Sequence, residues 1–294
     1  MAASKTATQP TRRRAARPGP ARKTTVPTVL SRRLGRLLTH LRVSAGKTHQ
    51  DVVNKGFMAR ATLWRYEEGK TSPDMVRVRA LAQYYGADAA TIDAVGDLAK
   101  AAANAQAQWD ESNVPDWFRL YVDLEAVADR ILHFDGTLVP GFLQTSDYAR
   151  AVYRTLSPDD GEDAVTQHVD LRLRRQASLF GRSPAPQLVA VLGEEVVTRP
   201  VGGEQVIAAQ VQHLRDVAAS GQVDVRIVPR SVGAYAAMIG PFRIFECAHE
   251  LDPDVVYVES QIGGRYYEKP SEVATYRRVF DLTIDQAVPI KEYR

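Results

Sequence analysis

The stretch ATLWRYEEGKTSP, residues 61–73, decides the fold of the N-terminal part of the chain, because it combines a short charged segment, a glycine stop and a polar turn into proline. We predict a helix over residues 59–68, with Leu63 and Tyr66 on its buried side. The opposite side is polar and partly cationic, and it carries Arg60, Ala61, Trp64, Arg65 and Glu68. That side is the first candidate for recognition of a partner molecule.

Two further helices are predicted before this stretch. Four leucines recur at helical spacing and predict a first helix, with Ser31 as its N-cap and Gly46 as its stop; they are Leu34, Leu37, Leu38 and Leu41. Thr48 and Asp51 have the spacing of a capping box, in which each side chain takes up a backbone donor of the first turn. A second helix therefore runs from there to about Lys55.

Two more helices are predicted after it. Ser72 is the expected N-cap of a fourth helix, with Pro73 in the first turn, where a missing amide donor costs nothing. The expected buried side of this helix consists of Val76, Leu81, Ala82 and Tyr85. An alanine-rich fifth helix spans about residues 89–108. The pattern over residues 31–108 thus predicts an all-α domain of about five helices.

A three-residue link, residues 56–58, joins the second and third helices. A helix-turn-helix needs such a link, because one helix crosses the DNA backbone while the next presents its N-terminal side chains to base edges. Residues 34–86 resemble the Cro/C1-type (XRE) helix-turn-helix family. The signatures that carry the resemblance are THQDV at 48–52, ATLWRYEEG at 61–69 and YYG at 84–86.

The resemblance implies roles for single residues. The implied base-contacting positions are Arg60, Ala61, Trp64 and Arg65, and the implied DNA-backbone contacts are Thr48, His49 and Lys70. Arginine can donate two parallel hydrogen bonds to guanine. Arg42 and Glu67 match a structural ion pair of this family, so Glu67 is not counted as a DNA contact. Trp64 keeps two interpretations, a DNA contact or packing on a neighbouring helix or partner.

The link departs from the family pattern. Val53 and Phe57 stand where the family usually has a small residue and a glycine, and Gly56 comes one place early. A phenylalanine is disfavoured in the left-handed conformation that the turn glycine adopts. We therefore expect the turn to use Gly56 instead.

Charge is distributed unevenly along the chain, although the formal net charge is only +3. Residues 1–30 hold seven Lys and Arg and no acid, and residues 31–86 hold eleven against four Asp and Glu; the remaining residues hold 20 against 31. We expect residues 1–30 to form a disordered basic arm, with an organellar targeting segment as the alternative. A basic front on an acidic body suggests a nucleic-acid-binding end and a separate module.

The remaining residues, 109–294, are predicted to form an α+β domain that begins at a join rich in aromatic residues and proline. Helices are expected at about 121–133, 166–180, 203–220 and 271–287. Strands are expected at 187–192, 223–229, 242–247, 255–259 and 265–268, which would make a sheet of roughly five strands.

This part resembles a C-terminal domain of unknown function that accompanies helix-turn-helix modules in actinobacterial regulators. The matching blocks include LVPGFLQTSDYARAV at 138–152, RLRRQASL at 172–179, VRIVP at 225–229 and YYEKPSEV at 266–273. The resemblance implies that the domain senses a small-molecule effector or a small partner protein.

Other classes of protein find little support. The sequence contains no run of about 18 apolar residues, the length that a membrane-spanning helix needs. Its one cysteine cannot form an internal disulfide. We therefore expect a cytoplasmic protein. No Ser-His-Asp order indicates an enzyme, and Cys247 with His249 falls short of a zinc site. Glu125 with Arg150 or Arg172 either lines a pocket or forms ordinary surface ion pairs. We expect no catalytic residue, metal or cofactor.

The sequence therefore predicts a sequence-specific DNA-binding transcriptional regulator that acts on double-stranded DNA as a homodimer. Two alternatives stay open. One is an antitoxin-like protein-interaction module whose helix-turn-helix fold binds a partner, with Trp64 as anchor; the other is a small-molecule-modifying enzyme in the C-terminal domain.

Overall fold

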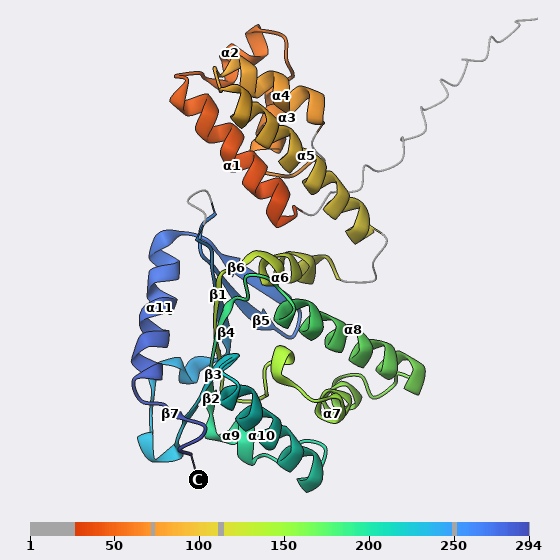
Figure 1. Cartoon of the computed structure of the whole chain (residues 1–294), viewed down its shortest axis with the longest axis vertical. Coiled ribbons are helices and arrows are strands. Elements are labelled where there is room, and N and C mark those ends of the chain that lie inside the picture. Colours follow the sequence, from red (N-terminus) through yellow and green to blue (C-terminus); the bar gives the residue numbers. More distant parts are fainter. Residues whose placement is uncertain (1–26, 72–73, 111–114, 249–251, 294) are drawn as a thin grey trace, which may run out of the picture.

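The structure, a computed structural model, describes residues 27–71, 74–110, 115–248 and 252–293. Figure 1 shows a helical N-terminal part stacked on a C-terminal part built around a sheet. The expected basic arm lies almost entirely outside the described residues, as do the expected cap Ser72 and Pro73.

Five helices form the N-terminal part, as predicted: α1 (Val29–Ser44), α2 (His49–Asn54), α3 (Arg60–Glu67), α4 (Met75–Tyr84) and α5 (Ala89–Asp110). They enclose a small core of their own. Its fully buried side chains include Leu38, Val52, Leu63 and Leu81, one from each of the first four helices. The apolar spacing of the sequence thus places these helices correctly.

Two expected helix starts were wrong. The N-cap of α1 is Thr28, whose hydroxyl accepts from the Ser31 amide, so the helix starts earlier than predicted. The N-cap of α4 is Asp74, because its carboxylate accepts from two amides of the first turn. The expected burial of Val76 was also wrong: Val78 has the helical spacing to Leu81, Ala82 and Tyr85 and is buried with them, whereas Val76 is 73% exposed.

The link between α2 and α3 turns at Gly56, which has a φ of +83°. Phe57 keeps a negative φ, and its ring packs 5.0 Å from that of Tyr84. The expectation that the turn uses Gly56 is confirmed, and Phe57 serves to pack the link onto α4.

The C-terminal part contains one mixed sheet of seven strands in the order β6-β5-β4-β1-β2-β3-β7. The strands are β1 (Arg130–Asp135), β2 (Gln187–Gly193), β3 (Val223–Val228), β4 (Phe242–Glu246), β5 (Val255–Ser260), β6 (Gly263–Tyr267) and β7 (Val288–Pro289). The central strands β1, β2 and β3 run parallel, and the outer strands pair antiparallel. The α+β class is confirmed.

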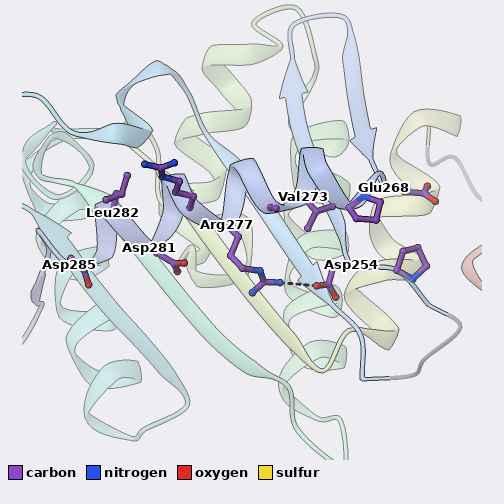
Figure 2. A pocket seen from close by; sticks show the side chains of 11 residues that line it. Asp254, Glu268, Val273, Arg277, Asp281, Leu282 and Asp285 are labelled. Carbon is purple, nitrogen blue, oxygen red and sulfur yellow. Dashed lines mark hydrogen bonds and ion pairs between the residues drawn. The ribbon is translucent and has the colours of Figure 1, made fainter.

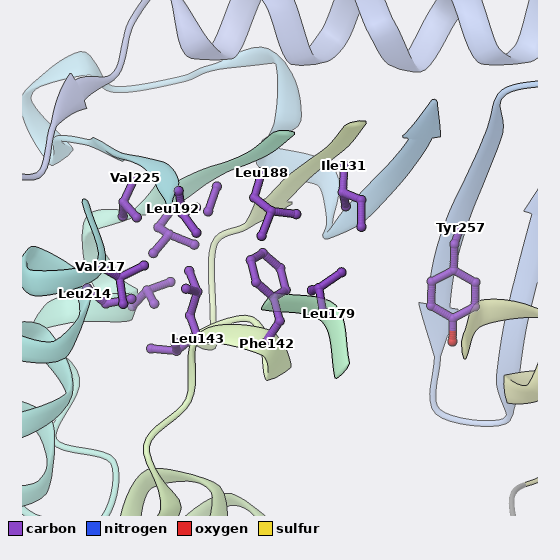
Figure 3. Packing of buried hydrophobic residues seen from close by; sticks show 14 of the residues in the cluster. Ile131, Phe142, Leu143, Leu179, Leu188, Leu192, Leu214, Val217, Val225 and Tyr257 are labelled. Carbon is purple, nitrogen blue, oxygen red and sulfur yellow. The ribbon is translucent and has the colours of Figure 1, made fainter. Parts of the chain in front are cut away.

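Helices cover both faces of the sheet (Figure 1). One face carries α6 (Asp116–Val127), α7 (Ser146–Leu156), α8 (Glu162–Phe180), α9 (Glu194–Thr198), α10 (Glu204–Ala219) and the short turn η1 (Gly141–Leu143). The other face carries α11 (Pro270–Ile284) and the turn η3 (Ala236–Ile239), while η2 (Arg230–Val232) follows β3. Figure 3 shows Phe142 and Leu143 packed beside Leu188 and Leu192 on the first face.

The predicted helix over residues 121–133 was wrong in its second half. Helix α6 ends at Val127, and the next residue, Ala128, is extended. Strand β1 follows at once and lies in the middle of the sheet. Both faces of this strand are buried, so its apolar run lacks the alternation that distinguishes a strand from a helix. With β7, which has only two residues, the sheet has seven strands rather than roughly five.

Candidate nucleic-acid interface

Helix α3 separates its two sides sharply. Leu63 is fully buried and Tyr66 is 6% exposed, whereas the four predicted base-contacting residues are all exposed. Those four residues are Arg60, Ala61, Trp64 and Arg65. The structure thus brings them together on one solvent-facing side of a short helix, the arrangement that entry into a major groove requires.

The inner side of α3 lies unusually close to α1. A side chain at Gly35 would place its Cβ 2.2 Å from the carbonyl oxygen of Glu67, so only glycine allows the two helices to approach this closely. At the end of α3, the Ser31 hydroxyl donates to the Gly69 carbonyl over 3.1 Å. The role of Gly35 was not predicted, although a glycine inside a leucine-rich helix is a signal of close packing.

Glu67 ties three helices together. Its carboxylate accepts from Arg42 of α1, with Nε 2.6 Å from Oε1 and Nη2 3.1 Å from Oε2. Nε2 of His49, at the start of α2, lies 2.7 Å from Oε2. Burial opposes ionisation of Glu67, but the hydrogen bonds from Arg42 and His49 outweigh it and hold the pKa of Glu67 below its usual value. The pair implied by the resemblance therefore fixes α3 to its neighbours.

The three residues expected at the DNA backbone all have contacts within the protein. The Thr48 hydroxyl donates to Asp51 over 2.7 Å as part of a complete capping box. His49 contacts Glu67, as described above. The ammonium of Lys70 lies 4.4 Å from the centre of the Trp64 ring. Trp64 is 46% exposed and belongs, with Lys70, to the same solvent-facing side of the domain.

The α3 face has chemistry suited to nucleic acid. Within the described residues, neither Arg60 nor Arg65 has a carboxylate partner, so both guanidinium groups are available to an external acceptor. Glu68, at the end of α3, lies 3.4 Å from Lys70. A fixed helix with unpaired arginines at its exposed side can read bases, because its positions do not shift on contact.

Ion pairs join the helical part to the sheet domain. Arg33 and Arg36 of α1 both donate to Asp252, whose side chain is only 2% exposed, and Arg32 contacts Glu268 beside it. Burial raises the pKa of Asp252, but the bonds from Arg33 and Arg36 have the larger combined effect and lower it below its usual value. The helix that supports α3 is thus also the one that contacts the C-terminal domain.

Glu125 forms no ion pair with Arg150 or Arg172 and does not belong to a surface pair, but it does line a small cavity together with Arg172, as one alternative expected. It is buried and accepts from Arg175 over 2.6 Å and from Arg243 over 3.1 Å. Arg150 instead contacts Glu162 on the surface. Arg243 was missed because it lies far from Glu125 in the sequence; the available signal was a charged residue in the middle of the apolar strand FRIFE.

A cavity of about 550 Å³ lies along α11 and is shown in Figure 2. It is an open groove. Its central cation, Arg277, already donates to Asp254 over 2.8 Å and also contacts Glu246. The groove lies next to Glu268, one of the acids that contact α1.

Two absences concern the described part of the chain. No helix there is long and apolar enough to cross a membrane. No group of three or more His, Cys, Asp or Glu side chains in residues 27–71, 74–110, 115–248 and 252–293 is arranged to hold a metal ion. His249, half of the Cys-Ala-His sequence considered above, lies outside these residues.

Comparison with protein families gives two matches. A family described as Helix-turn-helix domain matches residues 33–95, and a family described as Domain of unknown function (DUF5753) matches residues 118–293. No curated protein and no solved structure matches the chain. Both resemblances expected from the sequence are thereby confirmed, and the helix-turn-helix match contains the whole of α2, α3 and α4.

Proposed function

This chain belongs to the DUF5753 family, and we propose that it is a sequence-specific DNA-binding transcriptional regulator. The match to a helix-turn-helix domain supports DNA binding. The observation that carries the proposal is the α3 face, where two arginines without carboxylate partners stand on a helix fixed from behind.

In this proposal Arg60 and Arg65 donate to base edges in the major groove, and Ala61 contacts a thymine methyl group. Trp64 lies between them and contacts sugar or a base methyl. Lys70 contacts phosphate and so positions the domain without reading sequence. Thr48 and His49 reach the backbone at the start of α2, which requires each of them to share its present partner with a phosphate.

We infer that the regulator works as a homodimer on double-stranded DNA and that the C-terminal domain passes its signal through α1. The support for this route is structural: Arg33 and Arg36 bind the buried Asp252, while Arg42 on the same helix binds Glu67 of α3. A ligand or small partner protein that changes the C-terminal domain can thus bias the position of α3 through one helix.

The assignment is tested by comparing two variants on a DNA site enriched from random sequence. Arg65→Ala should relax the preference at one base step by about 1–3 kcal/mol, because it removes a base contact. Lys70→Ala should weaken binding to all sequences about equally and should reduce the salt dependence by one phosphate contact. Both are measured by fluorescence anisotropy over a series of single-base substitutions.

Lys100→Ala is the matched control, since Lys100 is an exposed cation on α5 outside the proposed interface. It should leave affinity and preference unchanged. If Arg65→Ala changed all sequences equally, the base-reading role would be wrong. If the chain showed no salt-dependent binding to any duplex, the protein-interaction alternative would replace DNA binding.

A further inference from the structure

A row of polar side chains crosses the middle of the sheet. His133 of β1, Arg243 of β4 and Tyr257 of β5 are direct cross-strand neighbours, so they project from the same face. That face otherwise carries the main apolar core, and all three residues are at least 93% buried. Polar groups in such a position are costly unless something satisfies them.

The cationic part of the row is only partly neutralised. Arg243 donates through Nη1 to Glu125, and Glu125 also accepts from Arg175 of α8, so one carboxylate serves two guanidinium groups. Burial lowers the pKa of Arg243 to about 9, which still leaves it charged at neutral pH. Arg243 and Arg175 therefore share one hydrogen-bonded carboxylate, and Glu259 is a further acid whose charge acts on Arg243.

His133, the neutral histidine of the row, has an N–H donor without an acceptor in the described structure. Nε of Arg243 donates to Nδ1 of His133 over 3.0 Å, so the proton of the neutral imidazole is on Nε2. Burial lowers the pKa of His133 to about 4, which keeps the ring neutral. Its Nε2 has no hydrogen-bond partner among the described residues, and a carboxylate oxygen of Asp135 is 4.0 Å away.

The Tyr257 hydroxyl is also buried and has no hydrogen-bond partner in the described part of the chain. His133 and Tyr257 line an inner cavity of about 80 Å³, which shares six lining residues with an outer cavity of about 370 Å³. The outer cavity has an aromatic wall at Phe118 and Tyr121 and reaches Arg172 and Arg175 of α8. Together the two cavities have the size of a small-ligand site.

The mouth of this site adds one more cation and one more acid. Arg172 has no carboxylate partner among the described residues; it contacts the side-chain oxygen of Gln144 and lies 5.1 Å from the Tyr153 ring. Glu259 of β5 lines both cavities and also has no ion-pair partner in the described part of the chain. Burial raises the pKa of Glu259, and this effect outweighs the opposing charges of Arg243, Arg172 and Arg175.

We propose that this cavity binds a small organic anion that also carries hydroxyl groups. The anionic group faces Arg172 and Arg175, which supply charged donors. A hydroxyl at the inner end accepts from His133 Nε2–H and donates to Asp135 or Glu259, because a single hydroxyl can do both. The inner atoms lie just below the accessible surface, so we expect the lining side chains to shift slightly on binding.

The groove along α11 does not compete for this assignment. Its central cation is already satisfied by Asp254 and Glu246, and none of its lining residues has a buried polar atom without a partner. The inference deepens the regulatory half of the proposed function and rests on that function for its consequence, but binding itself can be measured without DNA.

The test is calorimetric titration of the full chain with matched pairs of probes. Glucose 6-phosphate is paired with glucose, which lacks the anion, and tartrate is paired with succinate, which lacks the hydroxyls. At least one hydroxylated anion should bind at least about tenfold more tightly than its partner, since a charged hydrogen bond is involved. The two pairs also distinguish a phosphate ligand from a carboxylate ligand.

Two variants locate the site. Arg172→Gln should weaken the bound probe by about tenfold or more, whereas Arg174→Gln, an exposed arginine on the same helix that does not line the cavity, should not. Tyr257→Phe should weaken it by about three- to tenfold without lowering the melting temperature, because the lost hydroxyl has no protein partner.

The proposal is overturned if no probe binds at concentrations up to about 10 mM, because a Kd above that value means very weak binding. It is equally overturned if glucose and succinate bind as well as their charged or hydroxylated partners, or if Arg174→Gln and Arg172→Gln have equal effects. DNA binding by the same preparations is measured in parallel, so failure of the pocket and failure of the DNA-binding proposal give separate results.

Discussion

Two buried charge clusters, one in each part of the molecule, differ in how completely they are satisfied. In the helical part, both oxygens of the Glu67 carboxylate have hydrogen-bond donors, supplied by Arg42 and His49. In the sheet domain, Glu125 accepts from Arg175 and Arg243, but the chain of contacts continues to His133 and stops at an unpartnered nitrogen.

The difference indicates different purposes. A closed cluster fixes geometry, and here it holds α3 so that the exposed arginines keep their positions. An open cluster leaves unmet hydrogen-bonding capacity inside a cavity, which a ligand can complete. Under the two proposals, the recognition groups of the first part are outside and the buried charges support them, whereas in the second part the buried charges would themselves contact the ligand.

The largest effect on stability is expected from Glu125→Gln. The change leaves Arg175 and the fully enclosed Arg243 without their shared carboxylate, and an uncompensated buried charge costs about 3–5 kcal/mol. Urea unfolding of the full chain measures the loss. The matched control is Glu162→Gln, whose side chain is 66% exposed and whose pairs should matter by less than about 0.5 kcal/mol. Equal losses of stability in both variants would show that the buried Glu125 cluster contributes no more than a surface ion pair.

A smaller loss, of about 2–3 kcal/mol, is expected from Arg42→Met, which keeps the aliphatic stem but removes both hydrogen bonds to Glu67. DNA affinity should fall with it, because α3 loses its fixed position. Arg77→Met is the control, since Arg77 pairs with Asp74 on the surface and should change stability little. An Arg42→Met variant with unchanged stability would show that the closed cluster does not fix α3.

The smallest effect concerns pH. The pKa values of Glu67 and Asp252 are both lowered in the folded chain, so the folded state binds fewer protons than the unfolded state in acid. Their contribution is therefore complete above the unfolded carboxyl pKa of about 4 and is lost as pH falls through the lower folded values. Urea midpoints between neutral pH and about pH 3 should fall, and less steeply in Arg42→Met. An equal slope in both proteins would contradict the assignment for Glu67.

The sequence predicted the helical part well because its signals are local. Leucine spacing, the capping box at Thr48 and the displaced Gly56 turn each involve residues a few positions apart. The helix starts at Thr28 and Asp74 were missed because several polar residues near each start were equally plausible caps.

The cavity of the sheet domain could not be predicted, because it depends on contacts between distant residues. His133 and Arg243 are 110 positions apart and meet only through the pairing of β1 with β4. Since β1 was predicted as the end of a helix, neither its histidine nor the neighbouring strand could be placed. Charged or polar residues inside apolar runs, such as Arg243 in FRIFE, were the only available signal.

The central claim is that the exposed side of α3 reads DNA sequence, and selection of bound duplexes from a random library tests it most directly. The unmodified chain should enrich a sequence with two related half-sites, as expected for a dimer. The double variant Arg60→Ala with Arg65→Ala should lose that preference while it retains salt-dependent, non-specific binding. Enrichment of the same sequence with the same affinity by the double variant would contradict the claim.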